Sequence, residues 1–118
     1  MLKVLKKENI ELTISEKISK KLKLELKDYD LVAYDKFLFS FIFVLAIKDK
    51  TVYLLSSDKK GVETLNIKDL DKVLIDKKTD LNLYLKGGRV VNLTSVVGVK
   101  PKVMNQVREL NSEINRLK

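Results

Sequence analysis

Hydrophobic positions change their spacing near residue 30, from an ambiguous pattern to one typical of β-strands. Between residues 1 and 27, large aliphatic residues recur every fourth position, as on a helix: Ile14, Ile18, Leu22 and Leu26. Thr13 and Glu16 have the spacing of a capping box, which predicts a helix from about Ile14 to Leu26. Leucines also alternate with charged residues between 22 and 26, so the second half of this segment could instead pair as a strand.

The longest apolar run of the chain extends from Phe37 to Ile47 and predicts one strand. Its period of two places four aromatic side chains on one face: Phe37, Phe39, Phe41 and Phe43. Because aliphatic residues occupy the other face, we expect this strand to be central or to lie beneath a helix. An exposed aromatic face for a partner or a lipid is the alternative, and packing in the core is the preferred interpretation.

Short apolar segments separated by polar turns predict further strands at 52–55, 62–67, 72–77, 81–85 and 90–94. The turn at Gly87-Gly88 favours a three-residue loop that ends at Arg89. This loop pairs Leu85 with Val91 and Leu83 with Leu93, which keeps the apolar side chains on one face of the hairpin.

The end of the chain predicts an amphipathic helix of about 16 residues that begins at Pro101, a residue suited to a first helical turn. One stripe is apolar: Val103, Val107, Leu110, Ile114 and Leu117. Gln106 and Glu113 belong to the opposite, polar face. A stripe this short favours docking on the sheet over a coiled coil.

These elements predict an α+β fold, a bent antiparallel β-meander capped by a C-terminal amphipathic helix and preceded by an N-terminal helix. The length of 118 residues fits a single domain. We divide residues 1–118 into an N-terminal segment (1–27), a β-meander (31–97) and a capping helix (101–118).

Composition excludes the commonest catalytic chemistry. The chain has no cysteine and no histidine, which removes thiolate nucleophiles, serine triads with a histidine base and the usual zinc ligands. Asp28 and Asp30, like Asp69 and Asp71, have a spacing used for divalent metals, but aspartate is also typical of turns. We therefore expect no enzyme, no cofactor and no metal.

The net charge of +8 invites a nucleic-acid interpretation, but the positive excess is spread along the chain without a basic tail. Arginine, which suits base recognition, occurs only at 89, 108 and 116, so sequence-specific nucleic-acid binding is not favoured. The longest apolar run is too short for a membrane-spanning helix, and no signal-peptide pattern is present. We expect a cytoplasmic protein.

In a meander, alternate turns emerge at the same end of the sheet. One such end combines adjacent lysine pairs with the beginning of the last helix, whose free N–H groups favour anions. The candidate anion-binding residues at this end are Lys59, Lys60, Lys77, Lys78, Lys100 and Lys102. The competing interpretation is that these are solvated turn lysines.

The order of elements over residues 31–118 resembles the pleckstrin-homology-like (PH-like) superfold, in its small bacterial versions. The resemblance rests on the 37–55 hairpin, the strand–turn–strand at 65–75, the Gly87-Gly88-Arg89 turn and the helix ending at Leu117. It implies a half-barrel and a non-catalytic module that binds lipid headgroups, peptides or other domains. The basic K-x-K/R-x-R signature of phosphoinositide-binding members is missing from the first predicted hairpin, which offers only Lys48-Asp49-Lys50.

The sequence therefore predicts a non-enzymatic binding module, with a protein–protein adaptor as the first hypothesis. Its partner is another protein or, through an exposed strand edge, a second copy of the chain. The alternative is a peripheral binder of an anionic membrane or of nucleic acid that acts through surface lysines.

Overall fold

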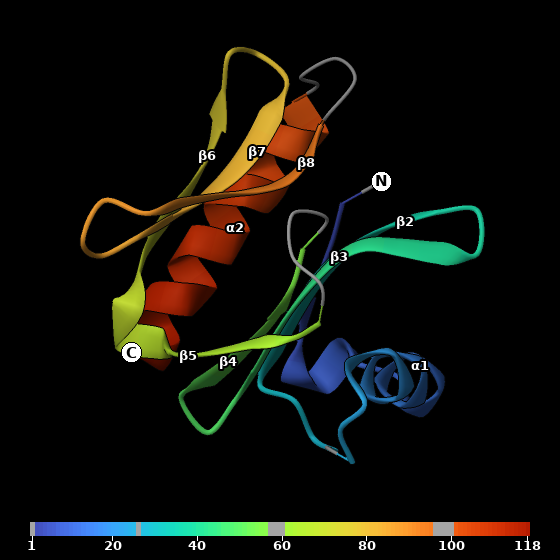
Figure 1. The fold of residues 1–118 in the computed structure, drawn as a ribbon. Coiled ribbons are helices and arrows are strands. Elements are labelled where there is room, and N and C mark those ends of the chain that lie inside the picture. Colours follow the sequence, from blue (N-terminus) through green and yellow to red (C-terminus); the bar gives the residue numbers. More distant parts are fainter. Residues whose placement is uncertain (1, 26, 57–60, 96–100) are drawn as a thin grey trace.

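The computed structural model describes residues 2–25, 27–56, 61–95 and 101–118. Within these residues the chain forms two α-helices and two antiparallel β-sheets (Figure 1), which confirms the α+β class. The helices are α1 (Leu12–Leu22) and α2 (Pro101–Leu117), and the short 3-10 helices are η1 (Lys7–Asn9) and η2 (Ile67–Asp69).

A five-stranded sheet holds the first five strands in chain order, and a three-stranded sheet holds the last three. The first sheet consists of β1 (Lys3–Lys6), β2 (Leu31–Phe37), β3 (Ser40–Lys48), β4 (Thr51–Leu55) and β5 (Glu63–Asn66). The second consists of β6 (Leu70–Asp76), β7 (Asp80–Leu85) and β8 (Val90–Ser95). The sequence pattern missed β1, and it predicted one bent sheet where the described residues form two.

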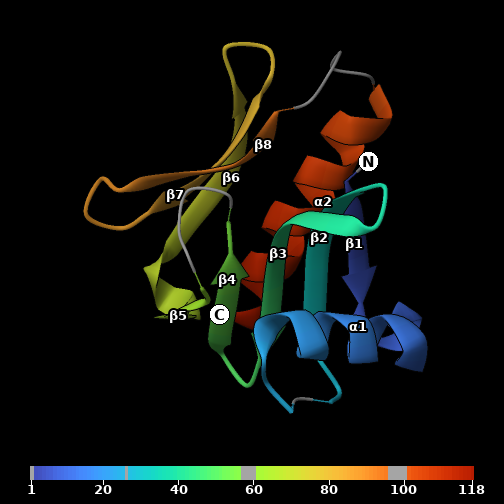
Figure 2. The same ribbon diagram turned by 45° about the vertical axis from the view of Figure 1, so that its right-hand side comes forward.

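The five-stranded sheet is covered on both faces. Phe43, Leu45 and Ile47 point to a core shared with the three-stranded sheet and α2. Val44 and Ala46, which alternate with them on β3, pack with α1 on the other face. Figure 2 shows α1 crossing this sheet on the side opposite to α2. The expectation that the apolar strand is covered on both faces is confirmed for the part of it that forms β3.

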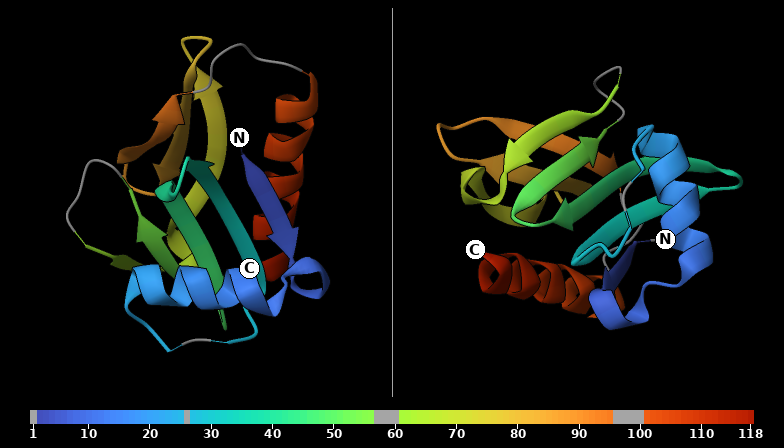
Figure 3. Two further views of the ribbon diagram at one scale, coloured as in Figure 1. Left: turned by 90° about the vertical axis from the view of Figure 1, so that its right-hand side faces the viewer. Right: turned by 90° about the horizontal axis from the view of Figure 1, so that it is seen from below.

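The last helix is confirmed. It begins at Pro101, and the whole stripe from Val103 to Ile114 is buried. The helix lies alongside β1 and β6, so it contacts one edge strand of each sheet (Figure 3). Its expected polar face is partly wrong, because Glu113 is buried beside Arg116 and Gln106 donates to the Leu2 carbonyl at 2.8 Å.

The first helix begins and ends earlier than expected. It starts at Leu12, so Thr13 lies inside the first turn, and the capping residue Glu11 makes no side-chain hydrogen bond. The predicted capping box is therefore wrong. The helix ends at Leu22, and its C-cap residue Lys23 has a left-handed φ of 56° that turns the chain away. Leu24 and Glu25 are not helical, and Leu26 lies outside the described residues.

The predicted strand from Phe37 to Ile47 is wrong in its first part. Phe37 ends β2, Leu38 and Phe39 form a two-residue turn, and Ser40 opens β3. A two-residue turn alone would put the two strands out of phase, because it pairs Phe37 with Ser40 on one face. The irregularity between Asp35 and Lys36 restores the phase for the rest of the hairpin, so the spacing of apolar residues does not reveal the break.

The four phenylalanines also do not share a face. Phe37 and Phe39 are exposed, whereas Phe43 is in the central core. The β2–β3 register shifts between Asp35 and Lys36, and this bulge places Phe41 with the α1 cluster on the other face. A bulge adds one residue to a strand, and one residue exchanges the two faces.

The β7–β8 hairpin has a three-residue loop, but the loop begins one residue earlier than predicted. Leu83 pairs with Val91, and the Leu85 N–H donates to the Arg89 carbonyl at 2.8 Å, so the loop comprises Lys86, Gly87 and Gly88. The predicted pairs are therefore wrong. The separation of apolar from polar faces is retained, because the register differs by an even number of positions.

Two other predicted strands have shifted bounds. β5 ends at Asn66, one residue before the predicted end, because η2 begins at Ile67, and the Asn66 side chain accepts a hydrogen bond from the Lys68 N–H at 2.9 Å. β6 begins at Leu70, two residues before the predicted start, and ends at Asp76.

Candidate functional site

The tip of the β2–β3 hairpin is apolar and exposed to solvent. The exposed fractions of Phe37, Leu38 and Phe39 are 68%, 77% and 96%. In Figure 1 the hairpin extends away from the rest of the molecule on the same side as α1. Three consecutive large apolar residues at a projecting turn have no partner in the fold, which is typical of a binding surface.

The backbone of this tip is unfavourable for the residue that it holds. Leu38 has a φ of 56°, in the left-handed region that glycine, asparagine and aspartate tolerate best. The other described non-glycine residues with positive φ are all lysine or aspartate. An apolar residue therefore occupies a turn position for which a polar residue or glycine costs less, and such positions are frequent at functional sites.

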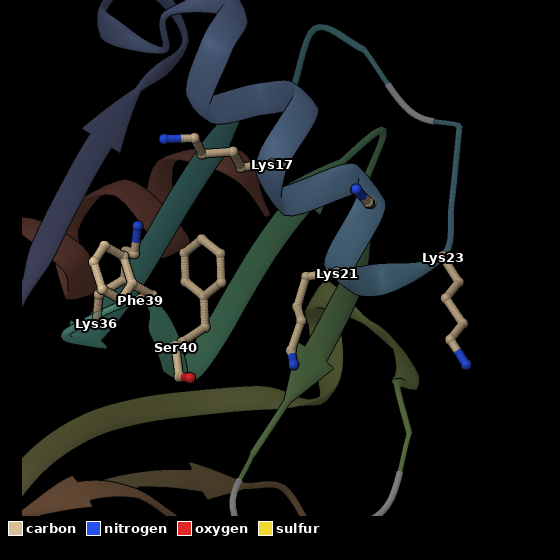
Figure 4. Close-up of a pocket in the computed structure, with 8 residues that line it drawn as sticks. Lys17, Lys21, Lys23, Lys36, Phe39 and Ser40 are labelled. Carbon is tan, nitrogen blue, oxygen red and sulfur yellow. The ribbon is translucent and has the colours of Figure 1, made fainter.

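A groove of about 520 Å³ lies between α1 and the hairpin. Five lysines line it together with Phe39, Ser40 and Phe41: Lys17, Lys20, Lys21, Lys23 and Lys36. Figure 4 shows Lys17 extending from α1 toward Lys36 and Phe39 on the hairpin, whereas Lys23 lies at the far end of the helix. The groove thus joins cations from two elements next to the exposed tip.

The helical period of α1 determines where its lysines lie relative to its buried face. Ile18 and Leu22 anchor α1 on the sheet, and the residues directly before them, Lys17 and Lys21, lie along the border of this buried face. Lys20 and Lys21 are in the last turn, where the negative end of the helix dipole stabilises cations. The dipole does not account for Lys36, which comes from β2.

Aromatic rings pack on the strand side of the groove. The Lys36 ammonium lies 5.2 Å from the centre of the Phe41 ring, a cation–π contact. Phe41 meets Tyr34 edge to face, with 5.5 Å between the ring centres. Burial, with a smaller contribution from the charge of Glu11, raises the pKa of the Tyr34 hydroxyl, so this aromatic pair stays uncharged at neutral pH.

Within the described part of the chain, none of the five groove lysines forms an ion pair. Lysines elsewhere do: Lys6 lies 3.7 Å from Glu109, and Lys7 lies 3.9 Å from Asp30. The groove therefore holds a concentration of positive charge that described carboxylates do not neutralise, and it can attract an anion.

The anion site predicted from the sequence lies elsewhere. Lys77 and Lys78 occupy the β6–β7 turn, Lys102 is in the first turn of α2, and all three are exposed. Figure 1 shows this turn and the beginning of α2 at the same end of the molecule. Lys59, Lys60 and Lys100 lie outside the described residues, so this site stays a prediction.

The described residues contain no group of three or more acidic side chains placed to hold a metal ion. Asp30 accepts a hydrogen bond from the Asp49 N–H at 3.0 Å, which stabilises the neighbouring turn. No described helix combines the length and apolar character needed to cross a bilayer.

The sequence contained two signals for the site found here. The segment from Leu31 to Lys48 is much longer than a usual strand of about 5–6 residues, so it requires a turn. Lys17, Lys20 and Lys21 have the i, i+3, i+4 spacing of one helix face. What joins the two signals is tertiary packing of α1 beside the hairpin, which spacing alone does not predict.

Comparison with known protein families, with curated proteins and with solved structures gives no match for this chain. Two features of the molecule therefore bear on its function: the hairpin tip, defined as Phe37, Leu38 and Phe39, and the groove with its five lysines.

Proposed function

We propose that this protein is a non-enzymatic module that docks on anionic membrane surfaces through the hairpin tip and the groove lysines. One observation carries the proposal: a largely exposed apolar turn projects beside a cluster of cations without described acidic partners. A lipid bilayer with anionic headgroups offers both kinds of partner in one surface, because acyl chains lie directly below the phosphates.

The two contributions are each moderate and support each other. Full burial of a leucine or phenylalanine side chain contributes about 1.5–3 kcal/mol, and Leu38 and Phe39 are almost fully available for it. A lysine near an anionic surface contributes about 1 kcal/mol. Stable membrane attachment generally needs two such signals, an apolar anchor and a basic patch.

The order of the elements supports a PH-like architecture as part of this proposal. The four strands β2–β5 precede the three strands β6–β8, and α2 follows and packs between the two sheets. In this interpretation β1 and α1 are an addition at the N-terminus. The addition supplies four of the groove lysines, on the outer face of the first sheet.

The protein–protein adaptor stays the second candidate, because a protein with an acidic, apolar surface would also cover the tip. Self-association predicts the same loss of exposure without any lipid. Vesicle binding distinguishes membrane docking from the adaptor and from self-association. Sedimentation of the protein alone then detects self-association.

The test is co-sedimentation with phosphatidylcholine vesicles that contain no anionic lipid or about one-third phosphatidylglycerol. We expect binding to the anionic vesicles at low salt and much weaker binding at 0.5 M salt, where the screening length is only a few ångströms. Binding to pure phosphatidylcholine should be weak, since the lysines then have no counter-charge.

Two sets of variants separate the contributions. Leu38→Ser combined with Phe39→Ser removes the apolar tip, and Lys17→Gln, Lys20→Gln and Lys21→Gln together remove three groove charges. The matched control also removes three exposed lysines, at positions 50, 68 and 86, outside the groove. All variants change exposed side chains, so their melting temperatures should stay close to that of the wild type.

We expect the tip variant and the groove variant to lose most binding and the control to keep it. Equal losses in the groove variant and the control would mean that only net charge matters. Absence of wild-type binding to anionic vesicles at low salt would overturn the proposal and leave the adaptor as the remaining candidate.

A further inference from the structure

The groove has the size of a site for a small molecule. Its volume of about 520 Å³ falls in the range of about 300–1,000 Å³ that is typical of ligand pockets. A flat basic surface would be enough for diffuse attraction to a membrane. A groove between a helix and a hairpin is instead typical of a site that binds one small ligand group.

The lysine ammonium groups around the groove repel one another, and a bound anion would reduce this repulsion. Lys17 and Lys21 are one helical turn apart, and like charges at this spacing destabilise a helix. Lys17 extends toward Lys36 on the strand side, whereas Lys21 points in a different direction (Figure 4). A compact group with more than one negative charge is attracted by all of these ammonium groups and can lie between Lys17 and Lys36.

We propose that the groove binds the phosphomonoester headgroup of a lipid, a proposal that rests on the proposed membrane docking. A phosphomonoester carries between one and two negative charges at neutral pH and presents three acceptor oxygens on one phosphorus atom. A phosphodiester such as that of phosphatidylglycerol has one charge and two such oxygens. Lysine ammonium groups are compact point charges, and they gain most from a compact dianion.

The location of the groove fits a headgroup rather than a free anion. Phe39 belongs to both the exposed tip and the groove lining. When the tip enters the acyl region, the groove is carried to the level of the phosphates, which lie directly above the acyl chains. Ser40 is exposed beside Phe39 and adds a hydroxyl donor at the same level.

The chain offers a direct test, because it contains no histidine. Between pH 7.5 and pH 5.5 a phosphomonoester with a second pKa of about 6 loses much of its second charge. Vesicles of phosphatidylcholine are prepared with phosphatidic acid, phosphatidylglycerol or cardiolipin, and their surface potentials are matched at pH 7.5. Binding of the wild-type protein is measured at both pH values.

We expect roughly five- to tenfold tighter binding to phosphatidic acid than to phosphatidylglycerol at pH 7.5, and a preference of less than about twofold at pH 5.5. Cardiolipin carries two phosphodiesters, so binding to it should resemble binding to phosphatidylglycerol at both values. Lys17→Gln with Lys21→Gln and Lys36→Gln should abolish the preference, while the control at positions 50, 68 and 86 should keep it.

The outcomes separate this inference from the function on which it rests. Equal binding to the three anionic vesicles at matched potential would overturn the headgroup site and leave membrane docking intact. A preference for cardiolipin that does not change with pH would overturn it too, in favour of two separate phosphodiesters. If none of the anionic vesicles binds the wild type, the proposed function fails and the headgroup site fails with it.

Discussion

The side chain of Asn111 on α2 forms two hydrogen bonds with the backbone of one residue, Val73 on β6. Its amide oxygen accepts from the Val73 N–H at 2.7 Å, and its amide nitrogen donates to the Val73 carbonyl at 2.9 Å. A neighbouring strand would make the same pair of bonds. Asn111 therefore satisfies part of the edge of the three-stranded sheet, which edge strands otherwise leave open to other chains.

Replacing Asn111 with alanine should lower the free energy of unfolding by about 1–3 kcal/mol, because it leaves two partly buried backbone groups without their partner. Urea unfolding measures the change. The matched control is Asn115→Ala, an exposed asparagine on the same helix, which should change stability by less than about 0.5 kcal/mol. Equal effects of both substitutions would contradict the role of Asn111.

Truncating Leu110 tests whether α2 is part of the core. Its side chain is fully buried, so Leu110→Ala should cost about 2–5 kcal/mol through lost packing. The exposed Arg108→Ala on the same helix should cost less than about 0.5 kcal/mol. Thermal melts of the two variants decide between a docked helix and a loosely attached one, for which both losses would be small.

Leu38→Asn should stabilise the protein while weakening the proposed membrane binding. Asparagine tolerates the left-handed backbone that costs a branched apolar residue about 1 kcal/mol, so the melting temperature should rise. Phe39→Asn is the control, because Phe39 has no positive φ and gains nothing from asparagine. A lower melting temperature for Leu38→Asn would contradict the assignment of strain to this turn.

Asp76 gives the fold a defined sensitivity to acid. Hydrogen bonds from the Tyr84 hydroxyl and, second, from the Asn82 amide lower the pKa of Asp76 below its usual value of 3.8. A carboxyl group with a lowered pKa in the folded state contributes stability above its usual value, and this contribution is lost as the pH falls through the lowered pKa.

Tyr84→Phe should therefore lose less stability than the wild type when the pH falls from about 5 to about 2. Urea unfolding across this range provides the comparison. Tyr53→Phe serves as the control, since the Tyr53 hydroxyl makes no hydrogen bond to Asp76, and its profile should follow that of the wild type. Parallel profiles for all three proteins would argue against the bond between Tyr84 and Asp76.

The last helix and most strands could be predicted from the sequence, because local spacing alone determines which of their faces is apolar. The helix from Pro101 needs only its 3.6-residue period, and the stripe that includes Leu110 is buried as expected. The strand β1 is too short to show a period, and it exists because β2 provides its hydrogen-bond partner.

The candidate site could not be predicted in the same way, for two physical reasons. The turn at Leu38 and Phe39 contains none of the residues that usually mark a turn, because both of its residues are large and apolar. The groove depends on the distance between Lys17 and Lys36, which belong to different elements, and this distance is set by how Ile18 packs α1 on the sheet.

The contact between β1 and α2 also determines when the fold can be completed during synthesis. The hydrogen bond from Gln106 to Leu2 spans 104 positions of the chain. At about 5–20 residues per second, a ribosome needs roughly 5 to 20 seconds to add this stretch. Until α2 has been added, the apolar residues that it covers in the folded protein stay exposed, and exposed apolar surface of this kind makes a nascent chain prone to aggregation.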